Sequence, residues 1–214
     1  LHLDELENLM EKVHIFKTHF AALDIRQNHG VHQETVQAIL KKENLIVQGL
    51  DELGDAELIP ILLREDISVH PDQFEDALIK DTIQSIIQMK RIQRKNGSEG
   101  CNRYIISHAE DIFSVLYVFS LLRWCGWGEG GVPVDIIPLF ESMEGMQNAG
   151  SIMQALFDIP PYRAHVAQRR NRQTIMLGFS DGTKDGGFLQ ANWSIYRTKE
   201  TLSAVCADYG IQAI

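Results

Sequence analysis

The chain has 214 residues, of which 44% are hydrophobic and 23% charged, and its formal net charge is −9. No apolar run approaches the roughly 20 residues that a membrane-spanning helix needs. The acidic balance argues against general nucleic-acid binding, which depends on clustered Lys and Arg. Three widely spaced cysteines predict neither a disulfide framework nor a paired-cysteine metal site. We therefore expect a cytoplasmic protein without nucleic-acid or membrane partners.

The first half of the chain is predicted to be mainly helical. Hydrophobic periodicity predicts four helices, over 3–17, 32–42, 55–64 and 71–94, and one early strand, over 19–25. The fourth helix carries an apolar stripe at near-helical spacing, which indicates a packed face. A polar stretch over 93–100 is the best candidate for an internal linker.

The second half alternates between strands and helices. Strands are predicted over 103–107, 134–139 and 174–179, and helices over 114–124, 143–157, 161–168 and 188–209. Alternation of this kind indicates a parallel sheet with crossover helices, and therefore an α/β fold. The three tryptophans, Trp124, Trp127 and Trp193, are interpreted as packing residues.

Two of the predicted strands end in a carboxylate. Glu141 follows the apolar run 136–140, and Asp181 follows the run 175–179. Strand ends carry the chemistry in parallel α/β proteins, and two carboxylates with waters form a normal site for Mg2+ or Mn2+. The alternative is that both acids are helix N-caps or first-turn residues favoured by the helix dipole. The pattern alone does not decide between these interpretations.

Four sequence strings resemble phosphoenolpyruvate carboxylase in order and approximate spacing. They are LDIRQ (23–27), YIIS (104–107), PLFE (138–141) and GFSDGTKDGGFLQANW (178–193). The resemblance implies a fragment from the front part of that family's catalytic barrel region. The fold would be a helix-rich partial (β/α)8 TIM-type barrel of about four βα units. Residues 1–30 would hold the first strand, 31–100 a helical insertion, and 101–214 the successive βα units.

The resemblance also implies roles for individual residues. Glu141 and Asp181 match the family's metal-binding carboxylates, and the ion would be Mg2+ or Mn2+. Arg26, expected at the end of the first strand, matches an arginine near the substrate phosphate, although a surface ion pair with Asp24 or another acid is the structural alternative. Lys184 matches a lysine near the phosphate and bicarbonate pocket. The implied reaction joins phosphoenolpyruvate and bicarbonate to give oxaloacetate and phosphate.

Residues near these positions receive structural interpretations. Asp185 is expected to cap the following helix, with orientation of Lys184 as the alternative, and His108 to be structural or peripheral. The glycines at 178, 186 and 187 are expected to allow tight strand-to-helix turns and close approach of the backbone to a ligand. The basic run over 169–172, with Arg163 nearby, is interpreted as a solvated helix end.

The resemblance further implies that this chain alone is inactive. The family's catalytic histidine would lie upstream and its glycine- and arginine-rich loop downstream, so the remainder of the parent chain is an expected partner. The parent would be a homo-oligomer, a tetramer by resemblance. Two alternatives remain open: another metal-dependent, enolate-forming barrel lyase or aldolase, and a non-enzymatic helical interaction module.

Overall fold

The structure is a computed structural model that describes residues 2–127 and 130–214. A four-stranded sheet of entirely parallel strands lies at its centre, in the order β1-β2-β3-β5. Its strands are β1 (Asp24–Asn28), β2 (Arg103–Ser107), β3 (Asp135–Phe140) and β5 (Met176–Leu177). The predicted helix-rich α/β fold with a parallel sheet is thus confirmed. Among the described residues, no helix is both long and apolar enough to cross a membrane.

The two faces of the sheet differ in burial. Side chains alternate along a strand, and Tyr104, Ile106 and Ile136 on one face are fully or almost fully buried in the hydrophobic core. The opposite face is more polar, because Asp24 and Arg103 stand in register there and form an ion pair of 2.8 Å. One face of the sheet is therefore covered by helices, whereas the other carries an ion pair at the first residues of β1 and β2.

Three helices separate β1 from β2, as the predicted insertion requires. They are α2 (His29–Lys42), α3 (Asp55–Leu62) and α4 (Ala77–Asn96). The prediction that the last helix starts at 71 was wrong. A short 3-10 turn occupies Pro71–Gln73, and α4 begins only after Asp76, whose side chain accepts the backbone N–H groups of Leu78 and Ile79.

The predicted linker over 93–100 is part of the packed body. Its first residues belong to α4, and the Gln93 side-chain amide donates to the carbonyls of Cys101 and Pro133. A short 3-10 turn over Ser98–Gly100 then leads into β2. The polar composition reflects exposure and hydrogen bonding to neighbours.

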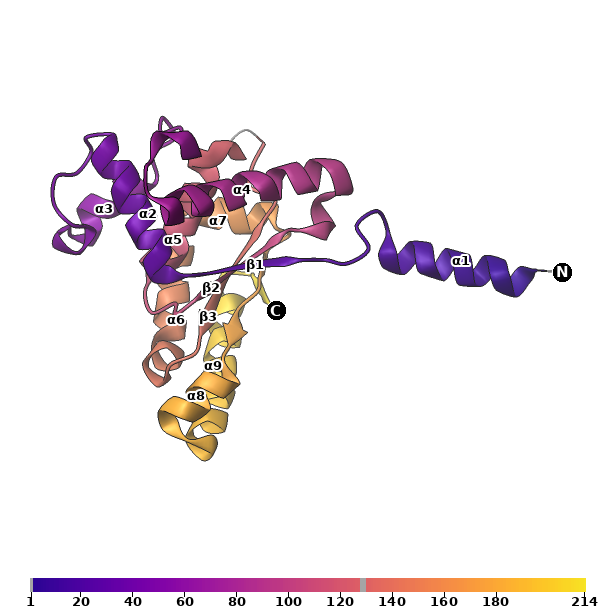
Figure 1. The fold of residues 1–214 in the computed structure, drawn as a ribbon. Helices are drawn as coiled ribbons and strands as arrows, with labels where there is room; N and C mark the ends of the chain where they lie inside the picture. Colours follow the sequence, from indigo (N-terminus) through magenta and orange to yellow (C-terminus); the bar gives the residue numbers. More distant parts are fainter. Residues whose placement is uncertain (1, 128–129) are drawn as a thin grey trace.

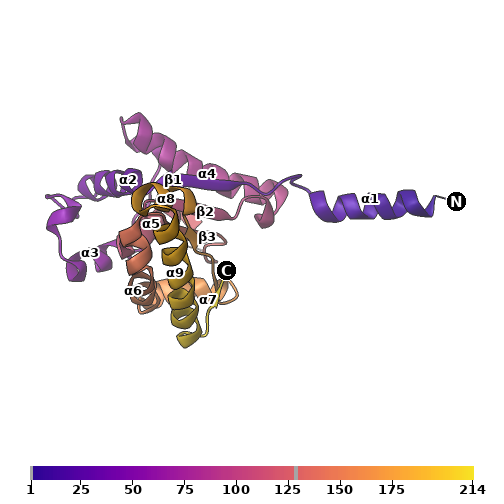
Figure 2. The same ribbon diagram turned by 90° about the horizontal axis from the view of Figure 1, so that it is seen from below.

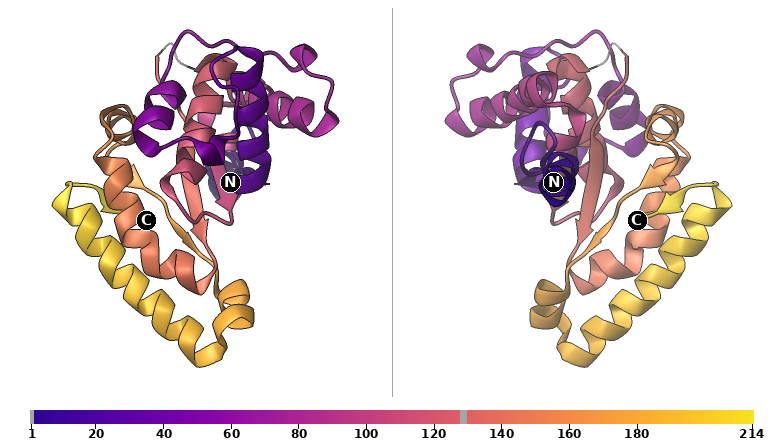
Figure 3. Two further views of the ribbon diagram at one scale, coloured as in Figure 1. Left: turned by 90° about the vertical axis from the view of Figure 1, so that its left-hand side faces the viewer. Right: turned by 90° about the vertical axis from the view of Figure 1, so that its right-hand side faces the viewer.

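The second half places one helix in the core and the others beside the sheet. These helices are α5 (Ile112–Leu122), α6 (Met143–Phe157), α7 (Pro160–Gln168) and α9 (Phe188–Asp208). Every residue of α5 from Ser114 to Leu122 is buried. Helices α6 and α9 pack along each other (Figure 3). Trp124 and Trp127 are buried as predicted, but Trp193 is 57% exposed and stacks on Tyr196.

The N-terminal helix α1 (Leu3–Phe16) projects away from the body, as Figures 1 and 2 show from two perpendicular directions. None of its residues is buried. The early strand is present but lies later than the predicted range 19–25, since Phe20 has a left-handed backbone (φ 63°) and the ladder with β2 starts at Asp24. The apolar residues Phe20 and Leu23, which produced the strand pattern, remain exposed.

The strand predicted over 174–179 is shorter than expected. Only Met176 and Leu177 pair with β3, and the chain enters α8 (Phe179–Gly186) at once. A second, two-stranded sheet joins β4 (Arg172–Gln173) to β6 (Gln212–Ala213).

The basic run over 169–172 is largely engaged with its neighbours. Arg169 pairs with Asp135 at 2.6 Å, and Arg172 donates to the Gln212 side chain. Arg163 donates to the backbone carbonyl of Tyr209. The interpretation as a solvated helix end therefore fits Arg170, which is exposed, better than the other arginines.

Candidate functional site

The residues singled out by the sequence gather at the carboxyl edge of the parallel sheet. Arg26 lies on β1, Glu141 directly follows β3, and Asp181 and Lys184 lie on α8, which follows β5. Arg26 sits in the middle of β1 because that strand continues to Asn28, so its predicted place at the strand end was wrong. Its long side chain nevertheless reaches Glu141.

Glu141 is held from two sides. Its Oε1 accepts the backbone N–H of His108 at 2.9 Å, and its Oε2 lies 3.7 Å from Nη2 of Arg26. Its side chain is only 14% exposed. Ser142 is the N-cap of α6 and accepts the N–H of Gly145, so the interpretation of Glu141 as a helix cap was wrong.

Asp181 lies in the first turn of α8, so the first-turn interpretation describes its position correctly. Its Oδ1 accepts a hydrogen bond from Nζ of Lys184 at 2.8 Å. That bond holds the pKa of Asp181 below its usual range, and Arg26 adds to the effect. The same bond raises the pKa of Lys184, with a further contribution from Glu141. Asp181 is thus influenced by both cations of the site, and Lys184 by both carboxylates.

The alternative of a surface ion pair for Arg26 with Asp24 or another acid is met by Glu141, at 3.7 Å, and not by Asp24. Asp24 instead pairs with Arg103 on the neighbouring strand at 2.8 Å. The Arg26 guanidinium, about half exposed, is directed toward the Glu141 carboxylate. The two carboxylates and two cations of the site therefore balance in charge.

The predicted capping role of Asp185 was wrong. Helix α9 starts after Gly187, whose backbone is left-handed (φ 81°) and which has no side chain to form a cap. Asp185 Oδ2 accepts the backbone N–H of Met143 at 2.8 Å. Because Met143 lies two residues after Glu141, this bond ties the α8 segment that carries Asp181 to the turn that carries Glu141.

Gly178 explains how the two turns come so close. Its N–H donates to the carbonyl of Phe140 at 2.9 Å. A β-carbon at position 178 would lie 2.5 Å from the β-carbon of Glu141, closer than two carbons can approach. The tight strand-to-helix turn expected at this glycine agrees with its position, and the neighbour that the backbone approaches is the Glu141 turn.

One contributor to the site, the main chain of His108, was missed by sequence reasoning. The backbone N–H of His108 binds Glu141, and the left-handed backbone of His108 (φ 60°) accompanies that placement. Its ring, more than half exposed, lies 3.4 Å from Glu110 and away from this bond. The ring is thus peripheral, as expected, while the main chain is not. Neighbouring parallel strands end side by side, which was the available signal for this contact.

The donor set suits a hard divalent cation that keeps part of its water shell. Within residues 2–127 and 130–214, no three His, Cys, Asp or Glu side chains gather closely enough to form a metal cage. Mg2+ is commonly held by one or two carboxylates, with waters and substrate phosphates as its other ligands. Glu141 and Asp181 match that requirement in number and chemistry.

Known proteins of similar sequence identify the family of this chain. The family model of phosphoenolpyruvate carboxylase matches residues 1–213. A phosphoenolpyruvate carboxylase of Mycobacterium leprae is 34% identical over 98% of the chain, and one of Gloeobacter violaceus is 32% identical over 97%. The chain spans 23% of the length of each of these two relatives. By this match along its length, the chain belongs to the phosphoenolpyruvate carboxylase family.

Proposed function

We propose that the parent protein carboxylates phosphoenolpyruvate with bicarbonate, giving oxaloacetate and inorganic phosphate, and that this chain supplies part of the active site. The supporting observation is the meeting of four side chains at one edge of the sheet: Arg26 from β1, Glu141 from the end of β3, and Asp181 and Lys184 from α8. The relatives named phosphoenolpyruvate carboxylase support the reaction. The finer roles below rest on side-chain chemistry.

Glu141 and Asp181 are the proposed ligands of Mg2+ or Mn2+. When bound, such an ion would stabilise the negative charge that develops on the enolate oxygen. The lowered pKa of Asp181 keeps it ionised and able to act as a ligand throughout the neutral range. The His108 N–H and the Asp185 bond to Met143 hold the two carboxylate-bearing turns in place.

Arg26 and Lys184 are the proposed anion-binding groups. In the structure each neutralises a carboxylate of the site, Arg26 at Glu141 and Lys184 at Asp181. Both side chains are long and at least half exposed, so they can turn toward the phosphate and carboxylate of a substrate at little cost. The planar guanidinium of Arg26 is suited to bind two phosphate oxygens at once, while Lys184 provides a mobile point charge.

The sheet is proposed to be the first part of a (β/α)8 barrel. Its strand order follows the chain order, all strands are parallel, and helices connect them in succession. The polar face with the Asp24–Arg103 pair would be the barrel interior. Residues 1–30, 31–100 and 101–214 then form the first strand region, the helical insertion and the successive βα units of one catalytic domain. We expect the 214-residue chain alone to be inactive, because a barrel site uses groups from many strands.

The proposal is tested in the full-length enzyme. Glu141→Gln and Asp181→Asn preserve shape but remove the charge, and each should lower the rate of oxaloacetate formation by about 100-fold or more. Glu144→Gln, in the first turn of α6 and exposed, is the matched control and should remain active. Full activity in both site variants would contradict the proposal.

A further inference from the structure

Exposed apolar side chains concentrate in the first 23 residues of the chain. Nine of the eighteen large apolar residues that are exposed among the described residues belong to this segment. They are Leu3, Leu6, Leu9, Met10, Val13, Ile15, Phe16, Phe20 and Leu23. Apolar residues that occur singly on a surface are normal, but a contiguous exposed patch marks an interaction site. The N-terminal segment is therefore a candidate docking surface.

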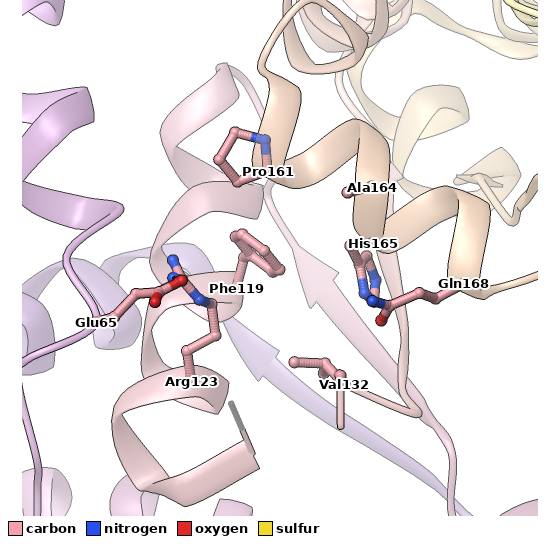
Figure 4. Close-up of a pocket in the computed structure, with 9 residues that line it drawn as sticks. Glu65, Phe119, Arg123, Val132, Pro161, Ala164, His165 and Gln168 are labelled. Atoms are coloured by element: carbon pink, nitrogen blue, oxygen red, sulfur yellow. Dashed lines mark hydrogen bonds and ion pairs between the residues drawn. The ribbon is translucent and has the colours of Figure 1, made fainter. Parts of the chain in front are cut away.

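The body of the protein covers apolar side chains of the same kind. Near the amino end of β3, Phe119 of α5 and Val132 are each 4% exposed, and α7 faces them with His165 (Figure 4). Met10 of α1 is 63% exposed by comparison, and none of the residues of that helix is buried. A helix of 14 residues is marginal in water without tertiary contacts, so α1 is expected to be covered by a partner.

The apolar residues of α1 form one stripe along the helix. Six of them lie three or four residues apart and are called the α1 stripe: Leu3, Leu6, Leu9, Met10, Val13 and Phe16. At about 100° per residue the six side chains cover an arc of about 140°. Polar residues such as Asn8 and Glu11 lie on the opposite face. The seam of a two-stranded coiled coil is narrower, so the α1 stripe fits an apolar surface formed by more than one helix.

The size of the α1 stripe favours a partner within the same polypeptide. A stable interface between separate chains usually involves roughly 20–30 residues on each side, whereas the stripe has six. A small surface can dock when its partner is covalently linked, because the effective concentration is then about millimolar for a short linker.

The relatives have room for such a partner. The 214 residues span only 23% of the length of the Mycobacterium leprae and Gloeobacter violaceus enzymes, so most of each relative lies outside the matched region. The family match begins at residue 1 and therefore includes α1.

We propose that the α1 stripe docks against an apolar surface formed by at least two helices of the same parent polypeptide, outside residues 1–214. Because α1 leads into β1, this contact fixes the amino end of the strand that carries Arg26. The inference rests on the chain being part of a longer protein. It does not rest on the carboxylation reaction, because no residue of the candidate site takes part in the contact.

The first test is hydrogen–deuterium exchange of the full-length protein. The amides of α1 should exchange at least about 100-fold more slowly than those of a free peptide of residues 1–23. Met10→Lys, in the middle of the α1 stripe, should raise the exchange rate by about tenfold or more, because it places a charge in an apolar contact. Asn8→Lys introduces the same residue on the opposite face and should leave the rate unchanged.

Two properties keep this comparison clean. Lys has a helix propensity similar to that of Met and better than that of Asn, so neither substitution weakens the helix itself. Exchange in α5, which is buried from Ser114 to Leu122, reports any global unfolding of a variant. Exchange of α1 as fast as in the free peptide would overturn the proposal. Equal effects of Met10→Lys and Asn8→Lys would also overturn it.

The second test identifies what α1 contacts. A photoreactive diazirine analogue of methionine is placed at position 10 of the full-length protein, and the cross-linked peptides are sequenced by mass spectrometry. Links within one chain to residues outside 1–214 are expected. A product of twice the chain mass would mean that a second copy covers α1, and links to residues 24–214 would mean that α1 folds back on its own body. Either result would overturn the proposal.

Discussion

The ionisable side chains near the two ends of β3 lie in opposite environments. At the carboxyl end, Asp181 and Lys184 are at least half exposed and pair with each other, so they remain charged. At the amino end, His165 is buried and neutral, and within the described residues its Nδ1 has no hydrogen-bond partner. A cluster of charges that can exchange partners suits the binding of ionic reactants, whereas the buried neutral ring packs against Phe119 and Tyr162. The same strand thus separates two environments with different chemical capacities.

The largest loss of activity is expected from a substitution of Lys184, at the charged carboxyl end. Lys184→Met in the full-length enzyme removes the cation but keeps much of the side-chain length. The specificity constant kcat/KM for phosphoenolpyruvate should fall by about 100-fold, because the charge proposed to bind the reacting phosphate is lost. Steady-state kinetics would check this, with Lys199→Met, exposed on α9, as the control. Unchanged kinetics would show that Lys184 only pairs with Asp181.

The second effect concerns Asp185, which connects the two carboxylate-bearing turns. Asp185→Ala removes the acceptor for the Met143 N–H and should weaken Mn2+ binding by about 10-fold or more. Asp185→Asn retains an oxygen acceptor and should restore part of the affinity. A loss of thermal stability with unchanged metal affinity would instead indicate a purely structural role.

Only part of this arrangement could be predicted from the sequence. The apolar runs and their alternation with helices were sufficient for the parallel sheet and for placing Glu141 at a strand end. The partner of Asp185 was not predictable, because the Met143 N–H lies 42 positions away in sequence and only the packing of α8 on α6 brings them together. Exposed apolar residues such as Phe20 and Trp193 were predicted to be part of a strand or of the packing, because hydrophobic periodicity does not show whether another element covers a residue.

A third, smaller effect is expected at Gly178. Gly178→Ala introduces a β-carbon 2.5 Å from that of Glu141, so the two turns must separate. We expect a loss of about 1–3 kcal/mol in the free energy of unfolding, together with weaker metal binding. Denaturant unfolding of the full-length protein would measure the first quantity. Gly54→Ala, where no atom lies within 4 Å of the added carbon, is the matched control.

The smallest effect belongs to the amino end of β3. The pKa of His165 is about 4 in the folded protein and near 6.5 when it is exposed. Between these values the unfolded chain binds a proton that the folded chain does not, so stability decreases as pH falls from 6.5 toward 4. His165→Phe should reduce this loss by up to about 1.4 kcal/mol per pH unit. Urea midpoints at about pH 7 and about pH 5 would reveal it, and identical pH dependence would contradict the assigned burial.

The proposed active site depends most on the convergence of Glu141 and Asp181 on one cation. Titration of the full-length protein with Mn2+, followed by electron paramagnetic resonance, measures that convergence directly. We predict one tight site per chain that is lost in Glu141→Gln, in Asp181→Asn and in the double variant, with no additional loss in the double variant. Tight Mn2+ binding that persists in the double variant would contradict the proposed roles of Glu141 and Asp181 and place the metal elsewhere.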